Sequence, residues 1–160
     1  MTSELATIWK NTENSYLGAE QQQQLSTYAQ SIASRMKALK DLEGIEEKIC
    51  NETADLIFER YPKVEKRVEG REKTVRDLIL ILRYCGQAML REDMQFLEDQ
   101  LLHWLRTMLV AFQFGNNCLK DSYIWLDQRC QHHLQAETYQ FLKPYLQAVT
   151  QIVPEGENRE

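Results

Sequence analysis

The chain has 160 residues, 43% of them hydrophobic and 27% charged, which is enough for one ordinary domain with its own core. Its formal net charge is −5, and a mildly acidic chain is a poor candidate for binding nucleic acid through phosphates. The sequence has only 6 glycines and 3 prolines, which favours helices with short connections, and it lacks the apolar run of about 18 residues that a membrane-spanning helix needs.

Residues 3–32 are expected to form a separate helical hairpin. Apolar residues recur at helical spacing on both sides of a stretch rich in turn formers at residues 11–18. These apolar positions are Leu5, Ile8, Trp9, Leu25, Tyr28, Ala29 and Ile32. The stripe is thin, so we expect the hairpin to pack on the rest of the chain or on a partner.

Two further helices are expected before a loop. The first runs from Arg35 to about Asp41 and closes near Gly44, and the second covers residues 45–61. Tyr61-Pro62 ends the second helix, because the residue before a proline avoids helical geometry. The charged stretch at residues 63–73 is interpreted as a loop or irregular segment.

Residues 74–90 are predicted to be the central helix of an all-α domain. The segment is apolar nearly all round, and it is too long to be a buried strand. Another strong helix follows at residues 93–112, and Asn117 is a plausible N-cap for the next one. Four positions mark that next helix at helical spacing, namely Leu119, Tyr123, Leu126 and Cys130.

The last helix is expected at residues 136–152, with Pro144 kinking it or splitting off its first turns. The polar tail at residues 154–160 is expected to be disordered. Two short N-terminal helices and about six more around one buried helix fit an all-α, globin-like fold. The expected domain organisation is a helical hairpin at residues 1–32, a globin-like helical domain at residues 33–153, and the tail at residues 154–160.

Candidate chemical sites are few. In a globin-like fold, His103 must be considered as a haem ligand. A proximal histidine needs an adjacent deep, planar pocket, whereas His103, flanked by Gln100 and Arg106, is more like a boundary position. His132-His133 is a weak metal candidate, since adjacent helix residues face different ways. No secretory signal begins the chain and no CxxC pair occurs, so we expect reduced cysteines, with Cys85 as a buried, inert thiol. No nucleophile–base constellation is evident, and the chain is not expected to be an enzyme.

One segment resembles a known family. Residues 74–83 are similar to the bilin-attachment helix of the phycobiliproteins, which typically reads Cys-x-Arg-Asp-x-x-Tyr-Tyr-Leu-Arg. Four positions match in place, namely Arg76, Asp77, Leu82 and Arg83. Further similarities lie at Tyr16-Leu17, residues 47–62, Asp93 and residues 139–149. The resemblance covers nearly the whole chain, is nearest to the allophycocyanin group, and implies the globin-like phycobiliprotein fold with its N-terminal hairpin.

The departures from the family motif bear on pigment binding. Thr74 stands where the family has its bilin-bearing cysteine, and a threonine hydroxyl does not replace a sulfur nucleophile. Leu80 and Ile81 stand where the family has the tandem tyrosines of its pigment pocket, so a reduced pocket is expected. Cys130 lies near the place where some members carry a second bilin, but the long loop of those members is absent.

Arg76 and Asp77 have two interpretations. The resemblance implies bilin-site positions, where the arginine pairs with a propionate and the aspartate accepts hydrogen bonds from pyrrole nitrogens. The alternative is that both residues cap or salt-bridge the start of the central helix, where the helix dipole favours a carboxylate.

The resemblance implies that the protein functions through protein–protein interaction. We expect a non-catalytic, bilin-free protein that helps to assemble or regulate the phycobilisome or photosynthetic complexes, in the cytoplasm or on the cytoplasmic face of the thylakoid membrane. Its partner would be a second copy or a phycobiliprotein-like subunit, docked through the hairpin at residues 1–32. The alternatives are non-covalent or transient bilin binding and, less favoured, a haem globin or sensor.

Overall fold

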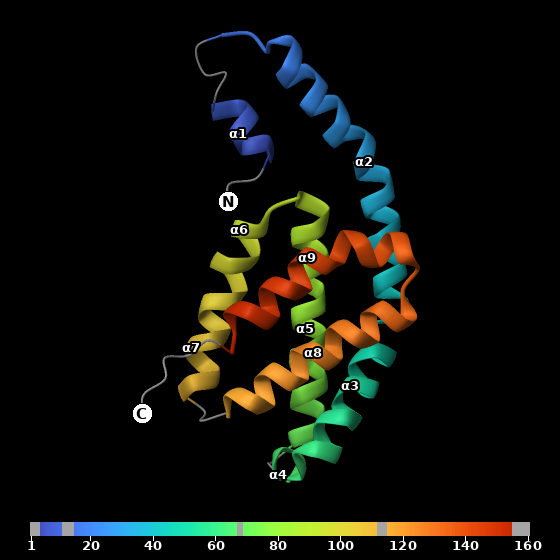
Figure 1. The fold of residues 1–160 in the computed structure, drawn as a ribbon, viewed down its shortest axis with the longest axis vertical. Helices are drawn as coiled ribbons and strands as arrows, with labels where there is room; N and C mark the ends of the chain where they lie inside the picture. Colours follow the sequence, from blue (N-terminus) through green and yellow to red (C-terminus); the bar gives the residue numbers. More distant parts are fainter. Residues whose placement is uncertain (1–3, 11–14, 67–68, 112–114, 155–160) are drawn as a thin grey trace.

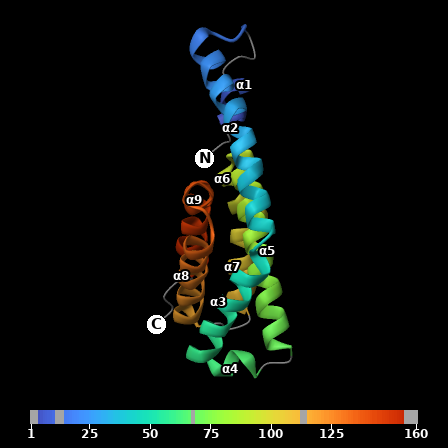
Figure 2. The same ribbon diagram turned by 90° about the vertical axis from the view of Figure 1, so that its right-hand side faces the viewer.

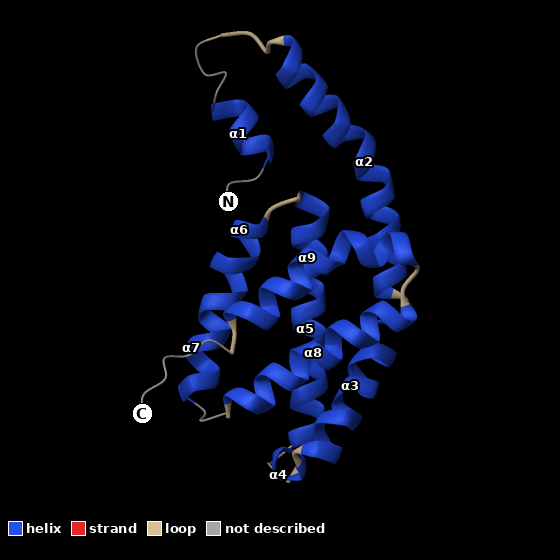
Figure 3. Ribbon diagram, in the orientation of Figure 1, coloured by secondary structure: helices blue, strands red, loops and turns tan. Residues whose placement is uncertain are grey.

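The computed structural model describes residues 4–10, 15–66, 69–111 and 115–154, and within these ranges every regular element is a helix (Figure 3). The all-α prediction is therefore confirmed. In chain order the elements are α1 (Glu4–Lys10), α2 (Ala19–Glu43), α3 (Glu46–Arg60), α4 (Pro62–Glu65), α5 (Gly70–Arg91), α6 (Met94–Leu97), a π-helical turn (Glu98–Leu102), α7 (His103–Ala111), α8 (Asn116–His133) and α9 (Ala136–Ile152). None of the described helices is apolar enough over a sufficient length to cross a membrane.

Helix α5 is the central helix, as the sequence predicts. It contacts α2, α3 and α9, and α8 and α9 cross over it as a second layer (Figures 1 and 2). The residues of α5 that are buried in the core are Leu78, Ile81, Leu82, Cys85, Ala88 and Met89. The four positions predicted to mark the helix at residues 116–133 are all buried as well. This arrangement is the globin-like packing expected from the sequence.

Helix α2 differs from the expected pattern of two separate helices. It is continuous from Ala19 to Glu43, since no glycine or proline interrupts this stretch. Its second half packs closely against α5 at Gly86, where a Cβ atom would lie 2.7 Å from the Leu39 side chain. Its first half projects with α1 beyond the other helices (Figures 1 and 2). The proposed boundary at residue 32 falls within this helix, and the hairpin as a separate unit remains a prediction.

The segment between α3 and α5 is more regular than expected. Helix α3 ends before Tyr61 as predicted, but Pro62 then occupies the first turn of the short helix α4. Gly70 starts α5 inside the stretch that was interpreted as a loop. A Cβ atom at Gly70 would lie 2.5 Å from the Val64 carbonyl oxygen, so the close approach of α4 requires a glycine here.

Two other boundaries also differ from the sequence interpretation. The helix expected at residues 93–112 contains a π-helical turn at Glu98–Leu102, and Asp93 caps its start by accepting a 3.0 Å hydrogen bond from the Phe96 amide. The N-cap of α8 is Gly115, so the prediction of Asn117 was wrong. Helix α9 runs through Pro144, which is exposed. The tail beyond residue 154 lies outside the described residues.

Arg35 joins α2 to the end of α5. Its side chain is fully buried, and its guanidinium donates to the carbonyl oxygens of Leu90 and, at 3.2 Å, Tyr28. It also lies 3.4 Å from a carboxylate oxygen of Glu92, the residue that ends α5 in the left-handed conformation. A cation at the C-terminal end of a helix is favoured by the helix dipole. No pattern in the sequence predicts this role of Arg35.

Candidate functional site: the cleft between α5 and α7

A cleft of about 560 Å³ lies between α5 and α7, with one wall completed by α4. The first half of α5 lines it with Lys73, Thr74, Arg76 and Asp77, and the next turn lines it with Leu80 and Ile81. The opposite wall comes from the π-helical turn and α7, through Leu101, Trp104, Leu105, Met108 and Leu109. All five positions singled out from the family motif at residues 74–81 therefore meet in one cavity.

Thr74 is half-buried in this cleft. Its hydroxyl donates a 2.7 Å hydrogen bond to the carbonyl oxygen of Gly70, one turn earlier in α5. The hydroxyl proton is thus used within the helix. The residue at the expected attachment position therefore offers only a threonine hydroxyl, which is a far weaker nucleophile than a cysteine thiolate.

Arg76 and Asp77 form an ion pair in the second turn of α5. The Nε and Nη2 atoms of Arg76 donate to Oδ1 of Asp77 at 3.1 and 2.9 Å, and both side chains are exposed. The same two residues also line the cleft, so forming a salt bridge with each other does not take them out of the cavity. An exposed pair of this kind contributes little to stability.

Leu80 and Ile81 make the floor of the cleft apolar. Leu80 is 38% exposed and Ile81 is 2% exposed. A reduced pocket was expected here, and a cavity of about 560 Å³ lies beside these two residues. Leucine and isoleucine provide no hydrogen-bonding side-chain groups where the family motif has tyrosines.

Leu82 and Arg83, the other matched positions, lie outside the cleft. Leu82 is fully buried in the core. The Arg83 guanidinium donates to the carboxylate of Glu46 in the first turn of α3, with the nearest atoms 2.6 Å apart, and this contact raises the pKa of Arg83. Both positions hold α5 in place rather than contact the cavity.

A smaller cavity of about 70 Å³ extends inward from the cleft towards α8. It shares Thr74, Asp77 and Ile81 with the cleft, and Cys118 and Tyr123 of α8 close its far side. Burial, together with the negative charge of Asp77, holds the pKa of the Tyr123 hydroxyl above its usual range. The Tyr123 hydroxyl is therefore protonated at physiological pH.

All four cysteines of the chain are buried, and none forms a disulfide. Burial raises the pKa of the Cys50 thiol to about 12 and holds the pKa values of Cys85 and Cys130 above the usual range of a thiol. The thiolate is the reactive form of cysteine. The thiols of Cys85 and Cys130 are consequently protonated, which agrees with the interpretation of Cys85 as a buried thiol.

We predict that the folded protein reacts very slowly with an aromatic disulfide reagent such as DTNB. All four thiols are shielded, whereas the Thr74→Cys variant places one extra thiol in the half-buried cleft position. The measurement is release of the coloured thiolate in native buffer and then in denaturant. Wild type should release four equivalents only on unfolding, and the variant should gain one faster equivalent. Rapid reaction of a native wild-type thiol would contradict this account.

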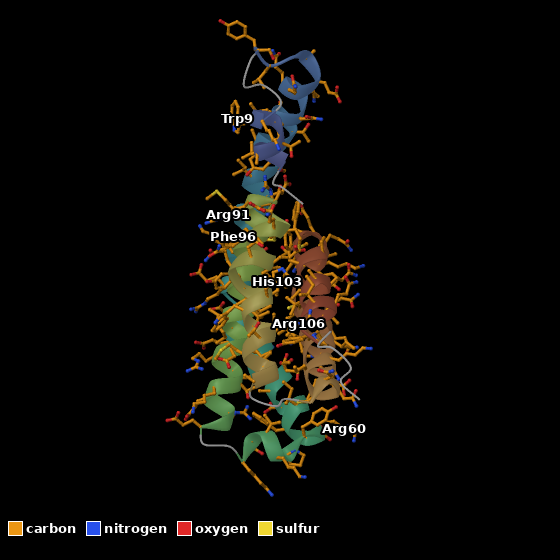
Figure 4. All side chains as sticks on the ribbon, turned by 90° about the vertical axis from the view of Figure 1, so that its left-hand side faces the viewer. Trp9, Arg60, Arg91, Phe96, His103 and Arg106 are labelled. Atoms are coloured by element: carbon orange, nitrogen blue, oxygen red, sulfur yellow. The ribbon has the colours of Figure 1, made fainter. Side chains whose placement is uncertain are left out.

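The histidines lie outside the cleft. His103 is exposed on the outward face of α7, beside Arg106 (Figure 4). The Nε2 atom of His133 lies 2.6 Å from a carboxylate oxygen of Glu52 on α3, and this hydrogen bond lowers the pKa of Glu52. Over the described residues, no group of three or more histidine, cysteine, aspartate or glutamate side chains is arranged to hold a metal ion.

Sequence reasoning missed one wall of the cleft. Trp104 belongs to the helix expected at residues 93–112, but its place beside the cavity, where 54% of its surface is exposed, was not predicted. Periodicity gives the faces of one helix, but it does not show which face a neighbouring helix covers. The π-helical turn at Glu98–Leu102 also changes which residues share a face along this helix, so a regular helical period does not hold across it.

Comparison with models of known protein families finds a match to this chain. A family model described as "Phycobilisome protein" matches residues 10–153 of the chain. The match includes the central helix, the cleft and all of α2. No curated protein matches the chain.

Proposed function

The chain belongs to the phycobilisome protein family, and from this premise we propose that it is a bilin-free member that acts by protein–protein interaction. Its role would be to assemble or regulate the phycobilisome or photosynthetic complexes, without catalysis, at the cytoplasmic face of the thylakoid membrane. The observation that carries the proposal is Thr74, which lies in the cleft where the family motif has its attachment cysteine.

No cysteine lines the cleft among the residues that the structure describes. A thioether to the pigment needs a reactive thiolate, and the four cysteines are buried, three of them with pKa values raised by burial. Cys118 lines the smaller cavity beside the cleft, and only 8% of it is exposed. These features favour a member that has lost covalent pigment and kept the fold.

The projecting hairpin of α1 and the first half of α2 is the surface we propose for association. Trp9 is 55% exposed, Tyr16 is fully exposed, and Met36 further along α2 is 55% exposed. Figure 4 shows Trp9 far along the molecule from His103 and Arg106. Tryptophan, tyrosine and methionine are enriched at protein–protein interfaces relative to the rest of the surface. The proposed partner is a second copy or a phycobiliprotein-like subunit.

The energy of such an interface is moderate. Burying one tryptophan and a few aliphatic side chains at about 25 cal/mol per Å² gives several kcal/mol before the cost of association is subtracted. A single aromatic anchor then carries a large share of the affinity. The interface is therefore testable by one substitution.

We predict that Trp9→Asp weakens association about 30-fold or more, because loss of a tryptophan anchor typically costs about 2 kcal/mol or more. The matched control is Trp104→Asp, since this tryptophan is equally exposed but lies on the cleft. Sedimentation velocity over a concentration series, alone and with a purified phycobiliprotein subunit, gives the dissociation constants. The proposal fails if wild type stays monomeric at high micromolar concentration and binds no such subunit, or if both variants behave alike.

Non-covalent bilin binding is the second candidate function. The observation in its favour is that Arg76 and Asp77 still line a cavity of about 560 Å³. Against it, Leu80 and Ile81 offer no hydrogen-bonding groups, and Asp77 already accepts two hydrogen bonds from Arg76. Tight, saturable binding of biliverdin that is lost in Arg76→Ala would favour this candidate.

A further inference from the structure

The polar groups of the α5–α7 cleft lie at one end. Lys73, Arg76 and Asp77 come from neighbouring turns near the start of α5, and beyond them the lining is aliphatic apart from Trp104. With one carboxylate against two cations, these charged lining residues sum to +1. A cavity with a cationic end and an apolar body is complementary to a ligand with an anionic end and an apolar tail.

We propose that this cleft binds a single-chain aliphatic carboxylate of the fatty-acid class. The carboxylate lies at Lys73 and Arg76, and the hydrocarbon chain runs along Leu80, Ile81 and Met108 beside Trp104. Binding is reversible and makes no covalent bond. This inference is independent of the association surface on the hairpin.

The cationic end has groups available for an incoming anion. The ammonium of Lys73 lies 3.3 Å from a carboxylate oxygen of Glu69, but both side chains are exposed, and such a pair is readily exchanged. Arg76 uses Nε and Nη2 for Asp77, while its Nη1 makes no hydrogen bond with the described part of the chain. A carboxylate at this end gains two charge-assisted contacts, and Asp77 limits the site to one negative charge.

The apolar end suits a hydrocarbon chain better than a pigment. A tetrapyrrole carries several pyrrole N–H and carbonyl groups, and each one buried without a partner costs about 1–3 kcal/mol. Leu80, Ile81 and Met108 provide no hydrogen-bond donors or strong acceptors, and the Thr74 hydroxyl proton is already donated to Gly70. A fatty-acid chain has no such groups to satisfy.

The length of the lining also fits a short chain. Lys73 and Ile81 are eight residues apart on α5, as are Leu101 and Leu109 on the facing helical run, and both pairs line the cleft. At 1.5 Å per residue each wall is about 12 Å long. This matches an extended chain of about ten carbons, so decanoate is the appropriate probe.

The test is isothermal titration of the full-length protein with decanoate and, in parallel, with decan-1-ol. We expect saturable binding of one decanoate per chain, about tenfold tighter than decan-1-ol. The double variant Lys73→Gln/Arg76→Gln should remove this tenfold preference, and Trp104→Ala should weaken both ligands. Arg71→Gln is the matched control, because Arg71 is an exposed arginine of α5 that does not line the cleft.

Three outcomes would overturn the proposal. The first is the absence of saturable decanoate binding by folded wild-type protein. The second is a lack of selectivity. Wild type would then bind decanoate and decan-1-ol with equal affinity, or Arg71→Gln would lose as much affinity for decanoate as Lys73→Gln/Arg76→Gln does. The third is binding of biliverdin that excludes decanoate with much higher affinity, which would assign the cleft to a pigment instead. All the substituted side chains are exposed, so circular dichroism should confirm that each variant is folded.

Discussion

Arg35→Ala is expected to lower the free energy of unfolding by about 3–5 kcal/mol. The substitution removes a fully buried guanidinium that joins α2 to the end of α5. It leaves the carbonyl oxygens of Tyr28 and Leu90 without this donor, and it removes the cation beside Glu92. The loss should also open a cavity, because the side chain is wholly enclosed.

Urea denaturation followed by circular dichroism measures this effect. Lys37→Ala is the matched control, since Lys37 lies two residues further along the same helix and is exposed. Its expected change is within about 0.5 kcal/mol. A loss below about 1 kcal/mol in Arg35→Ala would show that the buried guanidinium does not hold the two helices together.

The sequence predicted the elements whose apolar pattern is strong and local. The central helix and the helix marked by Leu119, Tyr123, Leu126 and Cys130 lie where the periodicity placed them. Tyr61-Pro62 ended α3 as predicted, because proline restricts the residue before it whatever the tertiary packing.

The features that were missed depend on tertiary contacts. Nothing local distinguishes Arg35 from an exposed helix residue, and its burial follows from the end of α5, which lies far away in sequence. The packing of the second half of α2 against α5 brings Leu39 and Leu42 to Gly86, a contact between segments far apart in sequence. The sequence pattern predicted helices on both sides of residue 33 but not this contact.

The candidate site was predicted in part. The family motif brought together Thr74, Arg76, Asp77, Leu80 and Ile81, and all five line one cleft. It indicated nothing about the α7 wall, where Trp104 lies, or about how much space remains. Those properties depend on how α7 is placed against α5, and a motif within one helix does not determine that placement.

The absence of covalent pigment is the second large effect that we expect. Thr74 provides no thiol, and the four cysteines are enclosed by the core. Protein made in cells that also synthesise phycocyanobilin should therefore carry no bilin through a thioether. A pigment-bearing phycobiliprotein subunit made in the same cells is the positive control, because it shows that bilin and attachment enzymes are present.

This member of the phycobilisome protein family is proposed to be bilin-free. The most direct test of that proposal is the absorption spectrum, after denaturation in acidic urea, of the protein made in cells that synthesise phycocyanobilin. Denaturation releases any pigment held by packing or hydrogen bonds and retains pigment held by a covalent bond. We predict that the wild-type chain is colourless under these conditions, while the control subunit keeps its visible band. A visible band that stays with the wild-type chain in acidic urea would contradict the account.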